Sequence, residues 1–347
     1  MHVPDGFIDA PTSAVTGVVA AGAIAVSLRG ARRELDEKTA PLAGLVAAFI
    51  FAVQMLNFPV AAGTSGHLLG GALAAILVGP YTGVLCVSVV LLMQGILFAD
   101  GGLTALGVNI TDMAIVTTVV AYAVFRGLLA VLPGGRRSVT VASFVAALVS
   151  VPAAAFAFTL IYAIGGTTDV ALGKVATAMI GVHVLIGIGE AVITALTVGA
   201  VIAVRPDLVH GARGLRRELK LRVNGELVDA PAAPVPAAAR TSRRTLWITG
   251  LVTSLVLAGF VSFYASANPD GLEKVAHDHG IDKRTEEHAS ADSPLADYGV
   301  KDISDARLSG GLAGVIGVGV TVVAGSAVFW AVRRRRTRDV SPAGTDV

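Results

Sequence analysis

The chain has 347 residues, of which 54% are hydrophobic and 15% are charged, and its mean hydropathy is +0.73. Apolar runs of about 18 residues or more recur, which excludes a pair of soluble domains and is typical of a protein with several membrane-spanning helices. The only cysteine, Cys86, excludes a disulfide framework and a multi-cysteine metal site. The net charge of +2 says little by itself, but the positions of the charges predict how the helices are oriented.

The sequence begins MHVPDG, with a histidine directly after the first methionine. The amine of Met1, the amide nitrogen that follows it and the imidazole of His2 can form two adjacent chelate rings around one ion. Such a unit fills three corners of a square, and an imidazole in the fourth corner completes a planar nitrogen site that favours Ni(II) or Cu(II). The alternative is that His2 lies on a frayed chain end without a function.

Seven apolar segments follow within the first 205 residues. We expect helices over residues 12–28, 41–58, 67–79, 81–98, 108–131, 138–164 and 175–204, with a turn-rich loop at 59–66. The 67–79 segment is short for a span, so it must tilt or be shielded by its neighbours. No basic residue precedes the first segment, whereas a basic cluster follows it at 29–38. By the positive-inside rule, we expect the N-terminus to lie outside the cell.

A linker and a second membrane unit are predicted after these segments. The basic linker ends in an alanine- and proline-rich run, 229–239, which we expect to be extended and poorly ordered. Two further spans, 245–265 and 310–332, enclose a polar loop, 266–308, with ten acidic and five basic residues. Four consecutive arginines, Arg333–Arg336, follow the last span and indicate a cytoplasmic C-terminus.

The predicted fold class is therefore an all-α integral membrane protein. A seven-helix membrane domain is followed by a linker, a two-helix transmembrane hairpin with an external loop, and a cytoplasmic tail. The predicted boundaries of these four parts are 1–205, 206–244, 245–335 and 336–347.

Several polar residues within or beside the spans are candidates for chemistry. His67 is expected on the same outer side as Met1 and His2, where it is either the fourth nitrogen of their site or an interfacial hydrogen-bonding residue. His183 and Glu190 are seven residues apart and share a helix face, so they either serve transport or fix helix packing.

A second set of polar residues surrounds an external loop. Gln94, Asp100, Asn109 and Asp112 are candidates to brace a metal-bound imidazole, although turn formation and helix capping also explain Asp100 and Asn109. His277, His279 and His288 either collect divalent ions loosely or belong to a solvated acidic surface, and the second interpretation is preferred because they have no regular ligand spacing. No GxxxxGK[ST], HExxH or serine-nucleophile motif occurs, so an ATP-driven process needs another subunit.

Several separated motifs resemble one family of membrane proteins. MHVPDGF at the start, GTSGHLLGG around His67, LLMQGILFADGGLTALGVNITDM at 91–113 and HVLIGIGEAVIT at 183–194 resemble the substrate-binding component of cobalt/nickel energy-coupling-factor transporters, the CbiM/NikM family. PDGLEKVA at 269–276 and SPLADYGV at 293–300 resemble the PDGLE domain, an accessory unit often fused behind such components.

The resemblance implies a non-enzymatic importer subunit in the cell membrane that captures Ni(II) or Co(II) from outside. It implies Met1, His2 and His67 as metal ligands, and a transmembrane coupling subunit and two cytoplasmic ATPases as partners. No permanent cofactor and no nucleic acid are expected. Binding should weaken as pH falls, because the nitrogen ligands must be deprotonated. Histidine is a large second residue, so Met1 should be retained.

Nickel and cobalt remain alternatives as the transported ion. Cobalamin synthesis and a nickel enzyme remain alternatives as its destination. A self-sufficient carrier that uses His183, Glu190 and Asp112 as an ion or proton path is the second hypothesis. An intramembrane enzyme is the third.

Overall fold

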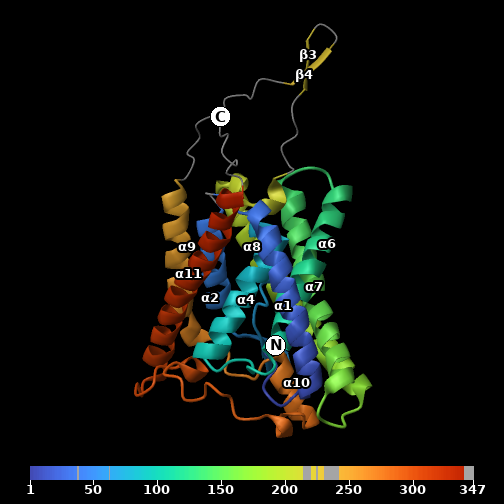
Figure 1. Ribbon diagram of the computed structural model, residues 1–347, viewed down its shortest axis with the longest axis vertical. Helices are drawn as coiled ribbons and strands as arrows, with labels where there is room; N and C mark the ends of the chain where they lie inside the picture. Colours follow the sequence, from blue (N-terminus) through green and yellow to red (C-terminus); the bar gives the residue numbers. More distant parts are fainter. Residues whose placement is uncertain (37–38, 62, 214–219, 224–225, 230–241, 340–347) are drawn as a thin grey trace, which may run out of the picture.

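Figure 1 shows the computed structural model of the chain, which describes residues 1–36, 39–61, 63–213, 220–223, 226–229 and 242–339. Much of the predicted linker 206–244, including nearly all of its alanine- and proline-rich run, lies outside the described residues. The same is true of most of the predicted tail 336–347.

The first part of the chain is almost entirely helical. Its elements are α1 (Ala10–Glu34), α2 (Ala40–Gln54), β1 (Phe58–Ala61), β2 (Thr64–Gly66), α3 (Gly71–Val78), α4 (Pro80–Leu97), α5 (Leu106–Asn109), the π-helix η1 (Ile110–Val116), α6 (Thr117–Val131), α7 (Arg136–Gly165) and α8 (Leu172–Val204). Because α5, η1 and α6 are continuous, the described part of residues 1–205 contains the seven predicted helices.

The second part contains two long helices separated by shorter ones. Its elements are the 3₁₀ turns η2 (Pro206–Leu208) and η3 (His210–Ala212), the hairpin β3 (Lys220–Val223) and β4 (Glu226–Asp229), α9 (Arg243–Gly259), η4 (Val261–Tyr264), α10 (Gly271–His279), η5 (Asp282–Arg284), η6 (Ala296–Tyr298) and α11 (Ala306–Asp339). The predicted external loop thus carries a two-turn helix, α10, at its start.

Seven helical segments among the described residues are long and apolar enough to cross a membrane. They are α1, α4, α5–α6, α7, α8, α9 extended by η4, and α11. The prediction of an all-α integral membrane protein is therefore confirmed. Within the first seven helices, α2 has 15 residues and α3 has eight, so both are shorter than a full bilayer span.

The region around His67 differs from the sequence-based expectation. Phe58–Ala61 and Thr64–Gly66 pair as antiparallel strands, with Phe58 opposite Gly66, where a turn-rich loop was expected. The helix expected over 67–79 begins only at Gly71, because Gly70 adopts a φ of 90°, which is incompatible with a helix. It ends at Val78, since Gly79 adopts a φ of 105° and Pro80 starts the next helix. The backbone of residues 67–70 is therefore irregular.

The two ends of the helix bundle hold different segments of the chain (Figure 1). The N-terminal segment and α10 lie at one end, whereas α1 and α11 finish, and α9 begins, at the opposite end. Basic residues occupy this second end, with Arg32 and Arg33 in the last turn of α1. The asymmetry agrees with the charge pattern of the sequence.

The two helices of the second part, α9 and α11, pack lengthwise against the first part (Figure 1), mainly on α2. The approach is close because small residues face one another: a Cβ atom added to Gly44 of α2 would lie 2.5 Å from the Ser326 Oγ of α11. Small residues allow helix backbones to approach in lipid, where helix association depends on packing. The helix pair α9 and α11 is thus an integral part of the bundle.

Candidate metal centre

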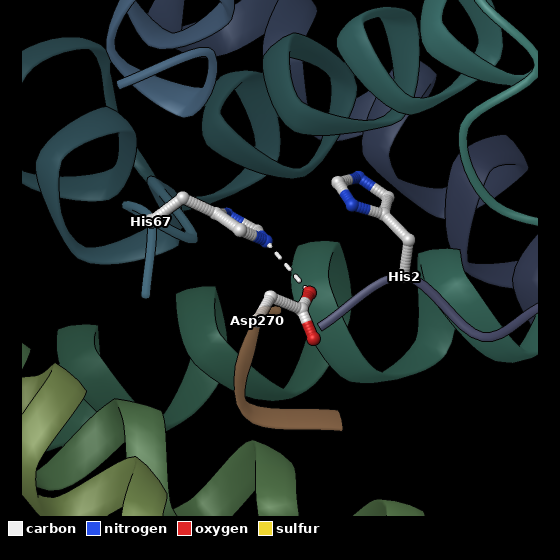
Figure 2. Close-up of side chains that lie close together, drawn as sticks. All are labelled: His2, His67 and Asp270. Atoms are coloured by element: carbon white, nitrogen blue, oxygen red, sulfur yellow. Dashed lines mark ion pairs between the residues drawn. The ribbon is translucent and has the colours of Figure 1, made fainter. Parts of the chain in front are cut away.

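Three parts of the chain that are far apart in sequence meet at the N-terminal end of the bundle. The amine of Met1 lies 2.6 Å from His67 Nε2 and 2.6 Å from a carboxylate oxygen of Asp270. The ligand atoms of His2, His67 and Asp270 lie within 4.8 Å of one another. Figure 2 shows these three side chains converging from the N-terminal segment, from the chain just before α3 and from the chain just before α10.

The N-terminal segment is fixed rather than frayed. Met1 is 2% exposed and Val3 is fully buried. The Val3 N–H donates to Asn109 Oδ1 at 2.7 Å, and the Val3 carbonyl accepts from the Gly102 N–H at 2.9 Å. The Asp5 carboxylate accepts bonds from the N–H of Thr104 at 2.8 Å and from its hydroxyl at 2.5 Å. These contacts hold the first residues against the loop after α4.

The imidazole of His2 is enclosed by polar partners. Its Nε2 lies 3.1 Å from Gln94 Oε1, and its Nδ1 lies 3.2 Å from Asp100 Oδ1. Its ring stacks on that of His67 with 5.1 Å between the centroids. Burial lowers the pKa of His2 to about 4, although the nearby Asp100 acts in the opposite direction. The ring is therefore neutral at neutral pH, as a metal-binding imidazole must be.

His67 lies on the irregular segment before α3, and neighbouring helices support this segment. Glu190 in α8 accepts the N–H of Leu69 at 2.7 Å and that of Gly70 at 3.0 Å. Gln54 in α2 donates to the Leu69 carbonyl at 3.0 Å. His67 Nδ1 faces the Leu68 carbonyl at 3.0 Å, which leaves Nε2 directed at Met1. Glu190 is thus connected to the centre through the backbone that carries His67.

Asp270 was not predicted from the sequence as a site residue. One carboxylate oxygen, Oδ1, accepts the Glu273 N–H at 2.8 Å and caps α10, while Oδ2 contacts the Met1 amine and lies 3.5 Å from His67 Nε2. Burial alone raises the pKa of Asp270, but the Met1 amine and His67 outweigh it and hold the pKa well below its usual value. The aspartate followed three residues later by glutamate is a recognisable capping-box signal. That signal identifies the helix start but not what the carboxylate faces.

The other predicted residues lie around the centre or away from it. Asn109 holds the Val3 backbone rather than an imidazole. His183 donates from Nδ1 to the Met179 carbonyl at 2.7 Å, and its Nε2 has no hydrogen-bond partner among the described residues. Asp112 is buried in η1, and both of its carboxylate oxygens likewise lack a partner in the described part of the chain. These residues do not form one continuous polar path with Glu190.

The three loop histidines are not equivalent. His277 is exposed, and its Nδ1 lies 3.1 Å from Asp282, while His279 is half-buried. His288 is half-buried, with its Nε2 3.2 Å from the Gly101 carbonyl. Gly101 in turn approaches the His2 ring closely, because a Cβ at this position would lie 3.2 Å from His2 Cβ. Only His288 therefore supports the turn beside the centre.

A cavity of about 610 Å³ opens onto the centre between the bundle and the loop 266–308. His2, His67 and Asp270 are among the residues that line it. Acidic side chains from both parts of the chain also line it; they are Asp5, Asp100, Glu273, Glu286 and Asp297. A cleft with this excess of negative charge attracts cations.

Residues 2–208 match the family model described as cobalt uptake substrate-specific transmembrane region, CbiM. The chain belongs to the CbiM family. Residues 244–334 of this CbiM-family protein match a second family model, the PDGLE domain, so the chain combines both units. Family membership identifies it as a component of metal transport.

Two relatives and one solved structure illustrate the likeness of this CbiM-family protein. The cobalt transport protein CbiM of Geobacter sulfurreducens is 30% identical over 296 residues, which cover 82% of this chain and 80% of that protein. The fused nickel transport protein NikMN of Rhodobacter capsulatus is 43% identical over 143 residues, or 41% of each chain. A crystal structure of a transition metal transporter is 30% identical, with a TM-score of 0.52, and the match covers 59% of this chain and 93% of that one.

Proposed function

We propose that this protein is the substrate-binding component of an ATP-driven energy-coupling-factor importer and that it captures Ni(II) or Co(II) at the outer face of the membrane. The ligands are the Met1 amine, the amide nitrogen of His2, the His2 imidazole and His67 Nε2. The observation that carries the proposal is the 2.6 Å distance between the Met1 amine and His67 Nε2, which brings the two ends of the nitrogen set together.

The chemistry of this set fits a planar complex. The amine and the amide nitrogen close a five-membered ring around the ion, and the amide nitrogen and His2 Nδ1 close a six-membered ring. His2 Nδ1 now faces Asp100, so an ion that binds there replaces this contact. Imidazole and deprotonated amide nitrogens suit Ni(II), and Co(II) accepts the same ligands. Relatives named for cobalt and for nickel transport support the same pair of ions.

The proposed topology places the metal centre outside and the basic helix ends in the cytoplasm. The N-terminal segment and α10 share one end of the bundle, and the arginine-rich ends of α1 and α11 share the other. We propose residues 1–205 as the metal-capturing domain, 206–244 as the linker, 245–335 as the accessory unit and 336–347 as the tail. We further propose, from the family resemblance, that a separate coupling subunit and two ATPases drive import; the sequence contains no phosphate-binding loop of its own.

The alternative, a self-sufficient carrier, is less well supported by the geometry. Its residues would have to form a path, but Glu190 accepts two backbone bonds from the segment that bears His67. His183 is bonded to its own helix. A structural role for Glu190 therefore accounts for its position.

The decisive experiment changes the chain end without changing any side chain. Three alanines added in front of Met1 displace the amine and the first amide from the chelate and leave the histidine too far from the new chain end to rebuild it, so affinity for Ni(II) and Co(II) should fall about 100-fold or more. Elemental analysis and calorimetric titration of the purified full chain measure the loss, and intact mass confirms the first residue of each protein.

Two histidine variants complete this experiment. His67→Ala removes the fourth nitrogen and should also abolish tight binding, whereas His277→Ala changes an exposed histidine of the external loop and should not. Stoichiometric tight binding by the extended protein would show that the chain end is not part of the site.

A further inference from the structure

Asp270 contacts two proposed metal ligands at the same time, although it belongs to the accessory unit. Its Oδ2 lies 2.6 Å from the Met1 amine and 3.5 Å from His67 Nε2. Carboxylate oxygen is not one of the four nitrogens of the proposed site. Its position therefore requires a role of its own.

The cavity gives Asp270 a particular place in the path of an ion. Asp270, His2 and His67 line it, whereas Met1, among the described residues, does not. An ion in the acidic cavity can therefore contact the Asp270 carboxylate without first contacting the amine. Carboxylates bind hydrated divalent ions without first losing a proton at neutral pH, whereas the amine and the amide must be deprotonated.

The backbone directly before Asp270 is fixed to the bundle. The Ser65 hydroxyl donates to the Asn268 carbonyl at 2.7 Å, and the Ser65 N–H donates to the Pro269 carbonyl at 2.8 Å. Because Oδ1 already caps α10, Oδ2 can change partner while the helix start is kept. The carboxylate is thus held in place with one oxygen available for exchange.

We propose that Asp270 is a transfer ligand, which binds the incoming ion in the cavity and passes it to the nitrogens of Met1, His2 and His67. In this exchange the ion–oxygen bond to Asp270 and the ion–water bonds break as ion–nitrogen bonds form, and the oxidation state of the ion does not change. The inference rests on the proposed function and deepens it, since it assigns the accessory unit a residue in metal loading.

A transfer ligand has a kinetic signature that a permanent ligand lacks. It lowers the barrier between the cavity and the final site, so it accelerates both binding and release. Asp270→Asn keeps a good helix cap and nearly the same shape but removes the charge. We expect association and dissociation of Ni(II) both to slow about 10-fold or more.

Stopped-flow mixing of Ni(II) with the purified full chain measures the association rate, and a chromophoric chelator in excess measures release. The same chelator gives the dissociation constant by competition. Asp270→Ser provides a second variant that keeps the cap but is too short to reach the amine, and it should reproduce the slowing. Circular dichroism confirms that both variants keep their helices.

Glu287→Gln is the matched control, because it removes one exposed negative charge from the same loop and does not line the cavity. Equal slowing in this variant would replace the inference with general electrostatic attraction. Unchanged rates in Asp270→Asn, or weaker binding caused by faster release alone, would also overturn it. If the unmodified chain bound no ion, the proposed function would fail instead, so the two failures are distinguishable.

Discussion

Glu190 is a buried carboxylate whose position is explained by the segment it holds. Both of its oxygens accept backbone N–H groups, one from Leu69 and one from Gly70. In Glu190→Gln, one oxygen becomes an NH₂ group that faces an N–H donor. A hydrogen bond to a charged group contributes about 1.5–3 kcal/mol, so the segment should loosen and metal affinity should fall about 10-fold. Calorimetric titration of Ni(II) measures the change.

Asp112→Asn serves as the control for this prediction. Asp112 is an equally buried carboxylate, but it has no hydrogen-bond partner among the described residues. Its substitution should therefore leave metal affinity nearly unchanged. An equal loss in both variants would indicate a general effect of buried charge rather than support of the His67 segment.

His2 should make the stability of the protein depend on pH. Burial lowers its pKa to about 4, whereas an unfolded histidine titrates near pH 6.5. Between these values the unfolded chain binds a proton that the folded chain does not, so stability is complete above about pH 6.5 and is lost as pH falls toward 4. The contribution is at most about 3.4 kcal/mol. Thermal unfolding in detergent without added metal should show this slope, and His2→Gln should reduce it, although other buried histidines keep part of it.

A histidine that lies away from the centre tests whether this slope is specific. His277→Gln changes an exposed side chain of the external loop and should keep the slope of the unmodified protein. If His2→Gln unfolded with the same pH dependence as the unmodified chain, burial of His2 would not be its origin.

The candidate centre was only partly predictable from the sequence. Some of its residues are identified by their neighbours in the chain, whereas Asp270 is identified only by the tertiary structure. The grouping of Met1 and His2 is a property of adjacent residues, and the polarity and position of His67 made it a candidate partner. In the structure the Met1 amine lies 2.6 Å from His67 Nε2. Asp270 could not be assigned from the sequence, because its meeting with Met1 depends on how the external loop folds back onto the bundle.

At the scale of elements, α10 is positioned by its contact with α8. A Cβ atom added to Gly271 would lie 2.9 Å from side-chain carbons of Val182 and Ile186, so the start of α10 fits against α8 only without a side chain. Gly271→Ala should push α10 outward by overpacking, at a cost of about 1–3 kcal/mol, and move Asp270 away from the Met1 amine. Hydrogen exchange of residues 271–279 should become faster.

Gly181→Ala is the control for this contact, because a Cβ atom at that position of α8 meets nothing within 4 Å. Exchange in α10 should then remain slow. Unchanged exchange in Gly271→Ala would mean that α10 does not depend on this close approach.

The long helices were predictable because their apolar runs are long and because the basic residues at their ends fall on one side of the membrane. The segment 67–79 was not, because hydropathy cannot distinguish a helix from irregular backbone that is shielded by protein. Gly70 and Gly79 interrupt it through positive φ angles. The pairing of Phe58–Ala61 with Thr64–Gly66 is not specified by the turn residues alone. Both differences occur where the chain shapes the candidate centre.

For the molecule as a whole, the docking of the accessory hairpin onto the seven-helix part decides whether Asp270 reaches the centre. The contact between α11 and α2 is close at Gly317, where an added Cβ would lie 2.2 Å from Phe51 Cζ and 2.8 Å from Phe98 Cζ. Gly319 lies on the same helix, and a Cβ there meets nothing within 4 Å. These two glycines offer a test of docking that leaves the rest of the chain unchanged.

A protease site inserted between residues 230 and 241 allows the two parts to be separated after purification in detergent. With the protease site as the only change, the cleaved halves should remain associated through α2, α9 and α11 and elute together. Gly317→Leu should release the hairpin, because a large side chain cannot fit against Phe51 without moving the helix. Gly319→Leu should not, because its side chain points into open space. If the halves of Gly317→Leu stayed together and loaded Ni(II) at the normal rate, close helix packing would not be what brings the accessory unit to the metal centre.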